Sequence, residues 1–170
     1  MTELRGASVL LRSTVREDVP ALADIRATPE VRARWRGGDD LAADMAADLE
    51  DPGIRCLTIG HRQRTVGMIQ WHAEEEPDCR HAGIDIFLDP AVHGRGLGAD
   101  AERTPARHLV DAHGHHRLVI DPAADNTAAI RCYTRVGFRP VGVMRRYERG
   151  ADGTWHDGLL RDLLAEELVR

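Results

Sequence analysis

The stretch Leu88-Asp89-Pro90-Ala91-Val92-His93-Gly94-Arg95-Gly96-Leu97-Gly98 decides the fold of this chain. The apolar residues 82–88 indicate a buried strand that ends at Asp89-Pro90, and a helix is predicted over residues 98–112. Glycine lets the backbone come close to a ligand, and the free N–H groups at a helix start attract anions. We therefore interpret the turn as a phosphate-binding device, with an ordinary glycine-rich loop as the alternative.

Two other phosphate-binding motifs do not fit this turn. A dinucleotide fold requires Gly-x-Gly-x-x-Gly after the first strand of a βαβ unit, whereas the glycines here are residues 94, 96 and 98, late in the chain. A nucleoside-triphosphate loop requires Gly-Lys-Ser/Thr, and the sequence contains no lysine. The ligand of the turn therefore has to be inferred from the elements around it.

Hydrophobic periodicity and turn residues predict the remaining elements. We expect strands at residues 8–12, 56–60, 65–71, 117–120, 140–147 and 155–164, and helices at residues 17–27, 29–35, 41–49 and 126–136. The predicted class is α+β, with a central mixed, mostly antiparallel β-sheet flanked by helices and two parallel strand–helix–strand connections in its second half. A length of 170 residues suits a single domain over residues 1–170.

Composition and charge narrow the classes of partner and the compartment. The 28 acidic residues exceed the 23 basic ones and give a formal charge of −5, which argues against nucleic acid and favours a cationic partner. The three cysteines form no paired motif, and neither a signal peptide nor a run of about 18 apolar residues is present, so we expect a cytoplasmic protein without a membrane segment. The histidines lack the spacing of a zinc site, so no metal is expected.

A second ordered pattern follows the turn, namely Asn126-Thr127-Ala128-Ala129-Ile130-Arg131-Cys132-Tyr133 and then Gly137-Phe138. Together the two patterns resemble the coenzyme-binding motifs of the GNAT superfamily of N-acetyltransferases, and the likeness covers residues 9–164. The resemblance implies a GNAT-like fold and acetyl-CoA as the acetyl donor.

By the same resemblance, the backbone of Ile86, Phe87 and Leu88 pairs with the pantetheine arm, and Asn126 hydrogen-bonds it. The N–H groups of the turn are expected to cradle the pyrophosphate, because a helix start offers unpaired donors and the positive end of a dipole. The residues assigned to this cradle are His93, Gly94, Arg95, Gly96, Leu97, Gly98 and Ala99.

Two residues depart from the family pattern. His93 stands where the family has Arg or Gln, and its charge depends on pH. Pro105 falls inside the predicted helix, where it removes one hydrogen bond and clashes with the preceding turn. We therefore expect a kink at Pro105 or a helix that restarts after Thr104.

Acetyl transfer to an amine requires an acid for the leaving thiolate and a base for the amine. Tyr133 shares a helix face with Asn126 and by the resemblance is the general acid, with a buried helix anchor as the alternative. Asp85 interrupts an apolar strand, where a carboxylate needs a partner, and Asp121 ends the next strand. We rank Asp85 before Asp121 as the base, and ammonium binding by either or a proton path through water remains open.

A looser likeness concerns the acceptor. The stretch Arg34-Trp35-Arg36-Gly37-Gly38-Asp39, the loop 71–78, Gly83-Ile84-Asp85 and Asp121-Pro122 resemble the aminoglycoside 6'-N-acetyltransferases. In that family acidic residues hold a polycationic aminosugar, which implies a cationic small-molecule amine as partner. The residues that this likeness assigns to the acceptor cleft are Trp35, Trp71, Glu74, Glu75, Glu76, Asp85 and Asp121.

Two other functions fit the sequence. One is a peptide or protein N-terminal acetyltransferase of the ribosomal-protein type, and the other is an acetyl-CoA-binding sensor without transfer activity. The acidic loop and the negative charge favour a small cationic acceptor over a protein tail, and the retained Asn126 and Tyr133 argue against the sensor. By resemblance alone, pairing through the C-terminal strands predicts a homodimer.

Overall fold

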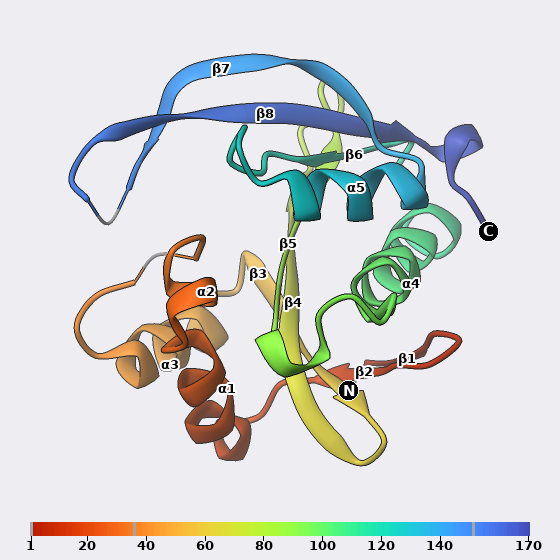
Figure 1. The fold of residues 1–170 in the computed structure, drawn as a ribbon. Coiled ribbons are helices and arrows are strands. Elements are labelled where there is room, and N and C mark those ends of the chain that lie inside the picture. The colour runs from red at the N-terminus through yellow and green to blue at the C-terminus, as the bar shows by residue number, and fades with distance from the viewer. Residues whose placement is uncertain (1, 36, 151) are drawn as a thin grey trace.

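The computed structural model describes residues 2–35, 37–150 and 152–170; Arg36, part of the stretch that resembles the aminoglycoside enzymes, lies outside them. Over the described residues, eight strands form one sheet with helices on both sides (Figure 1). The strands are β1 (Glu3–Arg5), β2 (Leu10–Ser13), β3 (Ile54–His61), β4 (Arg64–Glu74), β5 (His81–Leu88), β6 (Arg117–Ile120), β7 (Arg139–Arg149) and β8 (Trp155–Leu164). The helices are α1 (Val19–Arg26), α2 (Pro29–Arg32), α3 (Leu41–Glu50), α4 (Leu97–Asp111) and α5 (Thr127–Val136), with short 3₁₀ turns η1 (Arg16–Asp18), η2 (Pro90–Val92) and η3 (Ala165–Glu167).

The strand order is β1-β2-β3-β4-β5-β6-β8-β7, and only β5 and β6 run parallel among the strands described. The predicted α+β class with a mixed, mostly antiparallel sheet is thus confirmed. Of the two strand–helix–strand connections expected to join parallel neighbouring strands, only β5–α4–β6 does so among the strands described. Strand β8 returns between β6 and β7, so the strands on either side of α5 do not pair.

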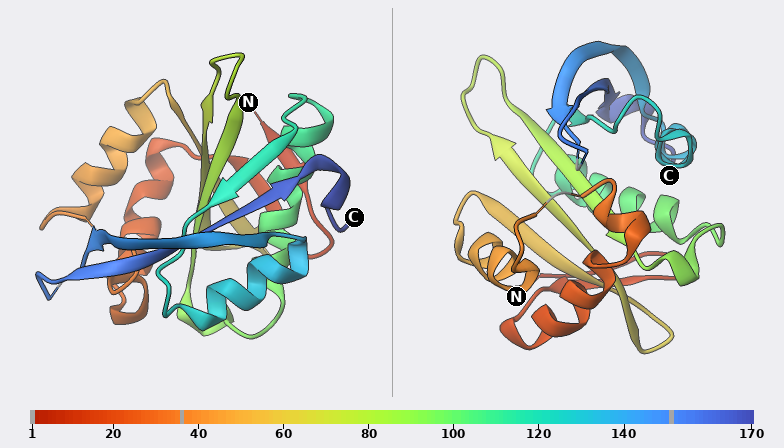
Figure 2. Two further views of the ribbon diagram at one scale, coloured as in Figure 1. Left: turned by 90° about the horizontal axis from the view of Figure 1, so that it is seen from above. Right: turned by 60° about the vertical axis from the view of Figure 1, so that its left-hand side comes forward.

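Two hydrophobic clusters fill the two faces of the sheet. Helices α1, α2 and α3 cover one face and α4 and α5 cover the other (Figure 2). Leu22, Met45 and Phe87 belong to the first cluster, and Ile69 and Leu109 belong to the second. Strand β5 therefore has buried side chains on both faces, as the unbroken apolar run before the turn indicates.

Helix α4 continues from Leu97 to Asp111 with Pro105 inside it, so the predicted restart after Thr104 is wrong. Pro105 is buried, and its packing within α4 offsets the hydrogen bond that proline cannot make. Near the start of the helix, the Asp100 carboxylate accepts backbone N–H groups of residues 7, 8 and 9 at 2.7–3.1 Å. This contact ties the β1–β2 turn to α4 and holds the helix start in place.

Helix α5 begins and ends at residues suited to those positions. The Asn126 side chain accepts the N–H of Ala129 at 3.2 Å and caps the first turn. Gly137 ends the helix with φ at +121°, and a Cβ atom there would approach the Glu167 carbonyl oxygen to 2.6 Å.

Among the described residues, no helix is long and apolar enough to cross a membrane.

Candidate active site

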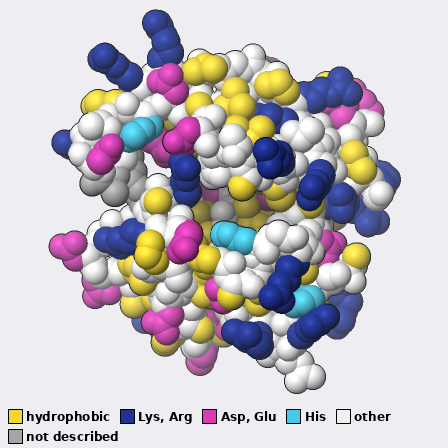
Figure 3. Space-filling model, viewed as in Figure 1, with side chains coloured by type: hydrophobic (Ala, Val, Ile, Leu, Met, Phe, Trp, Pro, Cys, Tyr) yellow, Lys and Arg dark blue, Asp and Glu magenta, His cyan; other side chains and the backbone are white. Residues whose placement is uncertain are grey.

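Strand β5 is paired on one side only for most of its length. Towards β4 it pairs from His81 to Leu88, whereas towards β6 it pairs only at Ala82 and Gly83. The sheet splays beyond this point, and a cleft of roughly 1020 Å³ opens there. Figure 3 shows the molecule hollowed across its middle, between the C-terminal strands above and the helices below.

Residues from helices and strands on both sides of the sheet, and from the loops between them, meet in this cleft. Those that bear on the chemistry are Trp35, Gln70, Asp85, Ile86, Phe87, Leu88, His93, Gly94, Gly96, Leu97, Gly98, Ala99, Asp121, Asn126, Tyr133 and Glu148. The two sequence motifs and both aspartates therefore face one space, although Asp85 lies on strand β5 and Tyr133 on helix α5.

The glycine turn forms one end of the cleft. Gly94 and Gly96 have φ of +74° and +79°, and open space surrounds the position of a Cβ atom at each, so their backbone conformation rather than crowding requires glycine. Gly96 is the N-cap of α4, whose first N–H groups are free for an anion. Of the residues assigned to the cradle, only Arg95 is not part of the cleft lining.

His93 makes its contact within the turn itself. Its Nε2 atom lies 3.1 Å from the carbonyl oxygen of Leu88, to which it donates. This bond fixes the turn against the end of β5 and engages the Nε2 atom of the ring. The departure from the family pattern therefore corresponds to a structural role for the His93 side chain.

Asn126 and Tyr133 present polar groups from α5. The Oδ1 atom of Asn126 is engaged in the helix cap, which leaves its amide N–H groups as donors towards the cleft. Tyr133 is 7% exposed and packs edge-on against Phe138, and its hydroxyl has no hydrogen-bond partner among the described residues. Burial raises the pKa of the Tyr133 phenol well above its usual value, so the phenol stays a proton donor.

The two aspartates lie in different environments. The Asp85 carboxylate accepts a long hydrogen bond of 3.4 Å from Gln70, and burial, then the nearby charge of Asp121, raises its pKa. Asp121 accepts a short hydrogen bond from the hydroxyl of Tyr147 on β7. The two carboxylates therefore differ in hydrogen-bond partner.

The acceptor walls differ in part from the prediction. Trp35 lines the cleft and packs edge-on against Phe87, with ring centroids 5.0 Å apart. Trp71 is instead 7% exposed in the core beside His108, away from the cleft, because it shares the strand face of Ile69 and not that of Gln70.

The acidic loop also lies away from the cleft. Glu74, Glu75 and Glu76 are exposed at the end of β4, and none of them is part of the cleft lining. Glu75 pairs with Arg80 at 2.8 Å, which anchors the loop to the residues that follow α4. The assignment of these three residues to the acceptor site is therefore corrected.

Sequence reasoning missed several polar groups around the site. Tyr147 and Glu148 belong to an exposed strand that carries no motif, and only tertiary structure brings them to Asp121. Glu102 is fully buried, and neither of its oxygens has a hydrogen-bond partner among the described residues. Glu102 lies three residues after Ala99 on the buried face of α4, so helical periodicity could have indicated that its side chain is buried.

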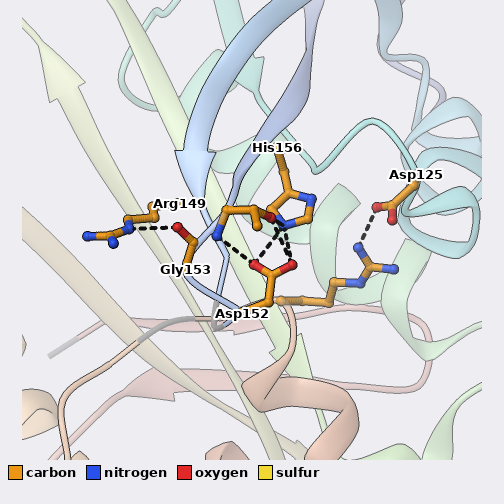
Figure 4. A network of polar contacts seen from close by, with 7 residues as sticks. Asp125, Arg149, Asp152, Gly153 and His156 are labelled. Atoms are coloured by element: carbon orange, nitrogen blue, oxygen red, sulfur yellow. Dashed lines mark hydrogen bonds and ion pairs between the residues drawn. The ribbon is translucent and has the colours of Figure 1, made fainter.

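Further polar contacts lie beside helix α2 and at the tip of the β7–β8 hairpin. Arg34, after α2, pairs with Asp125 of the β6–α5 loop at 2.5 Å (Figure 4). At the tip of the β7–β8 hairpin, His156 contacts Asp152 at 3.1 Å and Arg149 donates to the Gly153 carbonyl at 3.0 Å (Figure 4). The described residues contain no group of three or more side chains arranged to hold a metal ion.

The comparisons with known proteins agree with this geometry. The profile of the acetyltransferase (GNAT) domain matches residues 8–139. The chain therefore belongs to the GNAT acetyltransferase family, whose members use acetyl-CoA. Asn126 and the open edge of β5, with the free helix start beside them, offer the donors and the backbone edge that such a ligand needs.

Its relatives differ in their acceptors. An N-alpha-acetyltransferase RimI of Mycobacterium tuberculosis is 42% identical over 137 residues, which are 76% of this chain and 83% of that protein. An aminoglycoside N(6')-acetyltransferase type 1 of Klebsiella pneumoniae is 28% identical over 157 residues, or 81% of this chain and 77% of that one. A mycothiol acetyltransferase of Nocardia farcinica is 38% identical over 108 residues. The match covers 61% of this chain but only 35% of that protein.

Among solved structures, RimJ of Mycobacterium smegmatis in complex with a CoA disulfide superposes with a TM-score of 0.83. It is 24% identical, and the match covers 99% of this chain and 88% of that one. The likeness extends to the whole fold, including β7 and β8, which lie beyond the matched family profile.

Proposed function

We propose that this chain transfers the acetyl group of acetyl-CoA to a primary amine of a small polycationic acceptor, with the 6'-amino group of an aminoglycoside as the first candidate. The observation that carries this proposal is the meeting of Asp85, Asp121 and Tyr133 in one cleft, at the end away from the glycine turn. Carboxylates attract ammonium groups, and a phenol that keeps its proton can donate it to a leaving thiolate.

The donor half of the site supports acetyl-CoA. The unpaired edge from Ile84 to Leu88 offers backbone groups to the pantetheine arm, and Asn126 adds amide donors from the opposite wall. The free N–H groups at the start of α4 suit the pyrophosphate. The bound donor would supply the thioester carbonyl that the amine attacks.

Each polar residue has one step to perform. Asp85 or an intervening water takes the proton from the acceptor ammonium, since its raised pKa brings it nearer to neutrality. The amine nitrogen then bonds to the carbonyl carbon while the carbon–sulfur bond breaks. Tyr133 gives its proton to the departing sulfur and takes back the excess proton of the acetylated nitrogen, and Asp121 holds the acceptor by charge.

A second candidate is acetylation of the N-terminal amine of a peptide or protein. The observation in its favour is the 42% identity to the RimI relative, which exceeds the 28% identity to the aminoglycoside enzyme. The negative formal charge of −5 and the carboxylates of Asp85, Asp121 and Glu148 in the cleft favour the small cation.

The test is a thiol-release assay with acetyl-CoA and a panel of aminoglycosides, polyamines and peptides. We expect turnover on kanamycin-like amines and little on peptides. Turnover on peptides alone would replace the first candidate with the second, and absence of turnover on every amine would overturn the transfer proposal.

Two variants test the assigned roles in the same assay. Asp85→Asn should lower kcat by about 100-fold while the Kd for acetyl-CoA stays within about twofold, as expected for a proton-transfer group. Tyr133→Phe should lower kcat similarly, and an unchanged kcat would remove Tyr133 from the acid role. Equal losses of kcat and of coenzyme affinity in Asp85→Asn would make Asp85 a structural residue.

A further inference from the structure

Strand β7 departs from regular pairing close to the acceptor end of the cleft. Met144 pairs with Gly158 of β8 and Glu148 pairs with His156. An advance of four residues along β7 is therefore matched by an advance of only two residues along β8. Within this bulge Arg146 has φ at +50°, in the left-handed region that a residue with a side chain rarely adopts. Such bulges redirect side chains and occur next to active sites.

The bulge turns two side chains towards the cleft. The Tyr147 hydroxyl donates to the Asp121 carboxylate, and Glu148 forms part of the cleft lining. The hydrogen bond to Asp121, then burial, raises the pKa of Tyr147 to about 12, so it remains a donor across the neutral range.

Strand β8 is built to accommodate this arrangement. The Asp157 carboxylate accepts the N–H of Arg146 at 2.8 Å and thereby holds the left-handed residue. Gly158 leaves room for the Tyr147 ring, since a Cβ atom there would lie 2.8 Å from the ring. The backbone of β8 also bonds the loop after Asp121, through the Asp157 carbonyl to Ala124 and through Leu159 to Pro122, both at 2.8 Å. The bulge and the Asp121 loop are thus fixed to the same strand.

The result is a cleft end with three carboxylates, Asp85 from β5, Asp121 from the loop after β6 and Glu148 from β7. One oxygen of Asp121 is engaged by Tyr147, which restrains the carboxylate and leaves its other oxygen for a ligand. Three acidic side chains exceed what a single ammonium group needs for pairing, and they repel one another when no cation lies between them.

We propose that the β7 bulge determines acceptor specificity: Tyr147 is a positioning residue that orients Asp121 for one ammonium group, and Glu148 binds a second ammonium group of the same acceptor. The inference rests on the proposed transfer to a cationic amine and deepens it. The acceptor class is an amine with at least two positive charges.

The first experiment compares acceptors. Steady-state kinetics are measured with kanamycin, 1,6-diaminohexane and hexylamine for the wild-type chain, Tyr147→Phe and Glu148→Gln. Loss of one charge-assisted hydrogen bond or ion pair should raise the KM for kanamycin and the diamine about tenfold, with kcat and the KM for acetyl-CoA within about twofold. Glu148→Gln should leave the KM for hexylamine unchanged. An acceptor KM that stays at the wild-type value in either variant would overturn the role of that residue.

The second experiment tests whether the bulge conformation is responsible. Arg146→Gly and Arg146→Val remove the same charge, but glycine adopts a positive φ and a β-branched valine resists it. We expect the glycine variant to keep the wild-type acceptor KM, and the valine variant and Gly158→Ala to reproduce the rise seen in Tyr147→Phe. Val143→Thr, on the exposed part of β7, is the control.

The outcomes separate this inference from the function on which it rests. Equal acceptor KM values for Arg146→Gly and Arg146→Val would overturn the bulge as a specificity element. If the substituted residues had a purely structural role, the variants would change the melting temperature and all kinetic constants together. We expect instead that only the acceptor KM rises. Absence of turnover on any amine would overturn the transfer proposal as well, whereas turnover with preferred acceptors of single charge would overturn this inference alone.

Discussion

At the scale of the residue, Glu102 has the most unusual environment. It is fully buried, and its carboxyl group lies near Tyr133 and Cys132 of α5. Burial, then the charge of Asp85, raises the pKa of Glu102 to about 8 from an ordinary value of 4.5. Glu102 is therefore protonated in the folded chain at neutral pH, which spares the core a buried charge.

This pKa predicts how stability depends on pH. Between pH 4.5 and about 8 the unfolded chain loses the Glu102 proton while the folded chain keeps it, so the free energy of unfolding falls as pH rises through this window. Glu102→Gln removes the dependence, and we expect it to be more stable than wild type by roughly 4 kcal/mol near pH 8 and similar near pH 4.5. Urea unfolding across this range measures the difference.

The exposed Glu76→Gln is the matched control, and its unfolding curves should follow those of wild type at every pH. A difference between Glu102→Gln and wild type that stays constant with pH would contradict the prediction, because a packing effect does not titrate.

At the scale of the element, the start of α4 depends on Gly96. Its φ of +79° sets the direction of the first helical N–H groups. Gly96→Ala should cost about 1–2 kcal/mol of stability and raise the KM for acetyl-CoA several-fold, with the acceptor KM unchanged. Gly142→Ala is the control, because Gly142 has neither a positive φ nor a neighbour within 4 Å of a Cβ atom. A KM for acetyl-CoA that rises equally in both variants would contradict the role of the turn.

At the scale of the whole molecule, the cleft divides the sheet into two parts that share only two residue pairs between β5 and β6. A ligand that contacts both parts should therefore stabilise the fold strongly. Acetyl-CoA at about 100 times its Kd adds about 2.7 kcal/mol, which corresponds to a rise in Tm of about 5–10 °C for a domain of this size. Thermal unfolding with acetyl-CoA measures this.

Pantetheine, which lacks the pyrophosphate, is the control ligand and should raise Tm much less at the same concentration. Equal rises with both ligands would argue against anion binding at the glycine turn.

Much of the fold was predictable because its signals are local. The apolar runs of β5 and β6, the cap at Asn126 and the stop at Gly137 each depend on neighbours within a few residues, and the predicted elements match the observed ones there. Strand β1 was missed because three residues carry no periodic pattern. The prediction for Trp71 was wrong because a strand has two faces. Trp71 lies on the core face of β4 and its neighbour Gln70 on the face of the cleft.

By itself, the sequence determined the α+β class, the two GNAT motifs and the residues that we propose for the donor site, since helix starts, glycine turns and caps act over short distances. Only the tertiary structure decided which polar groups form the acceptor end. Asp121, Tyr147 and Glu148 are up to 27 residues apart, from residue 121 to residue 148, and meet through a bulge and a strand inserted between β6 and β7. Such contacts depend on strand order and register, which side-chain periodicity does not encode.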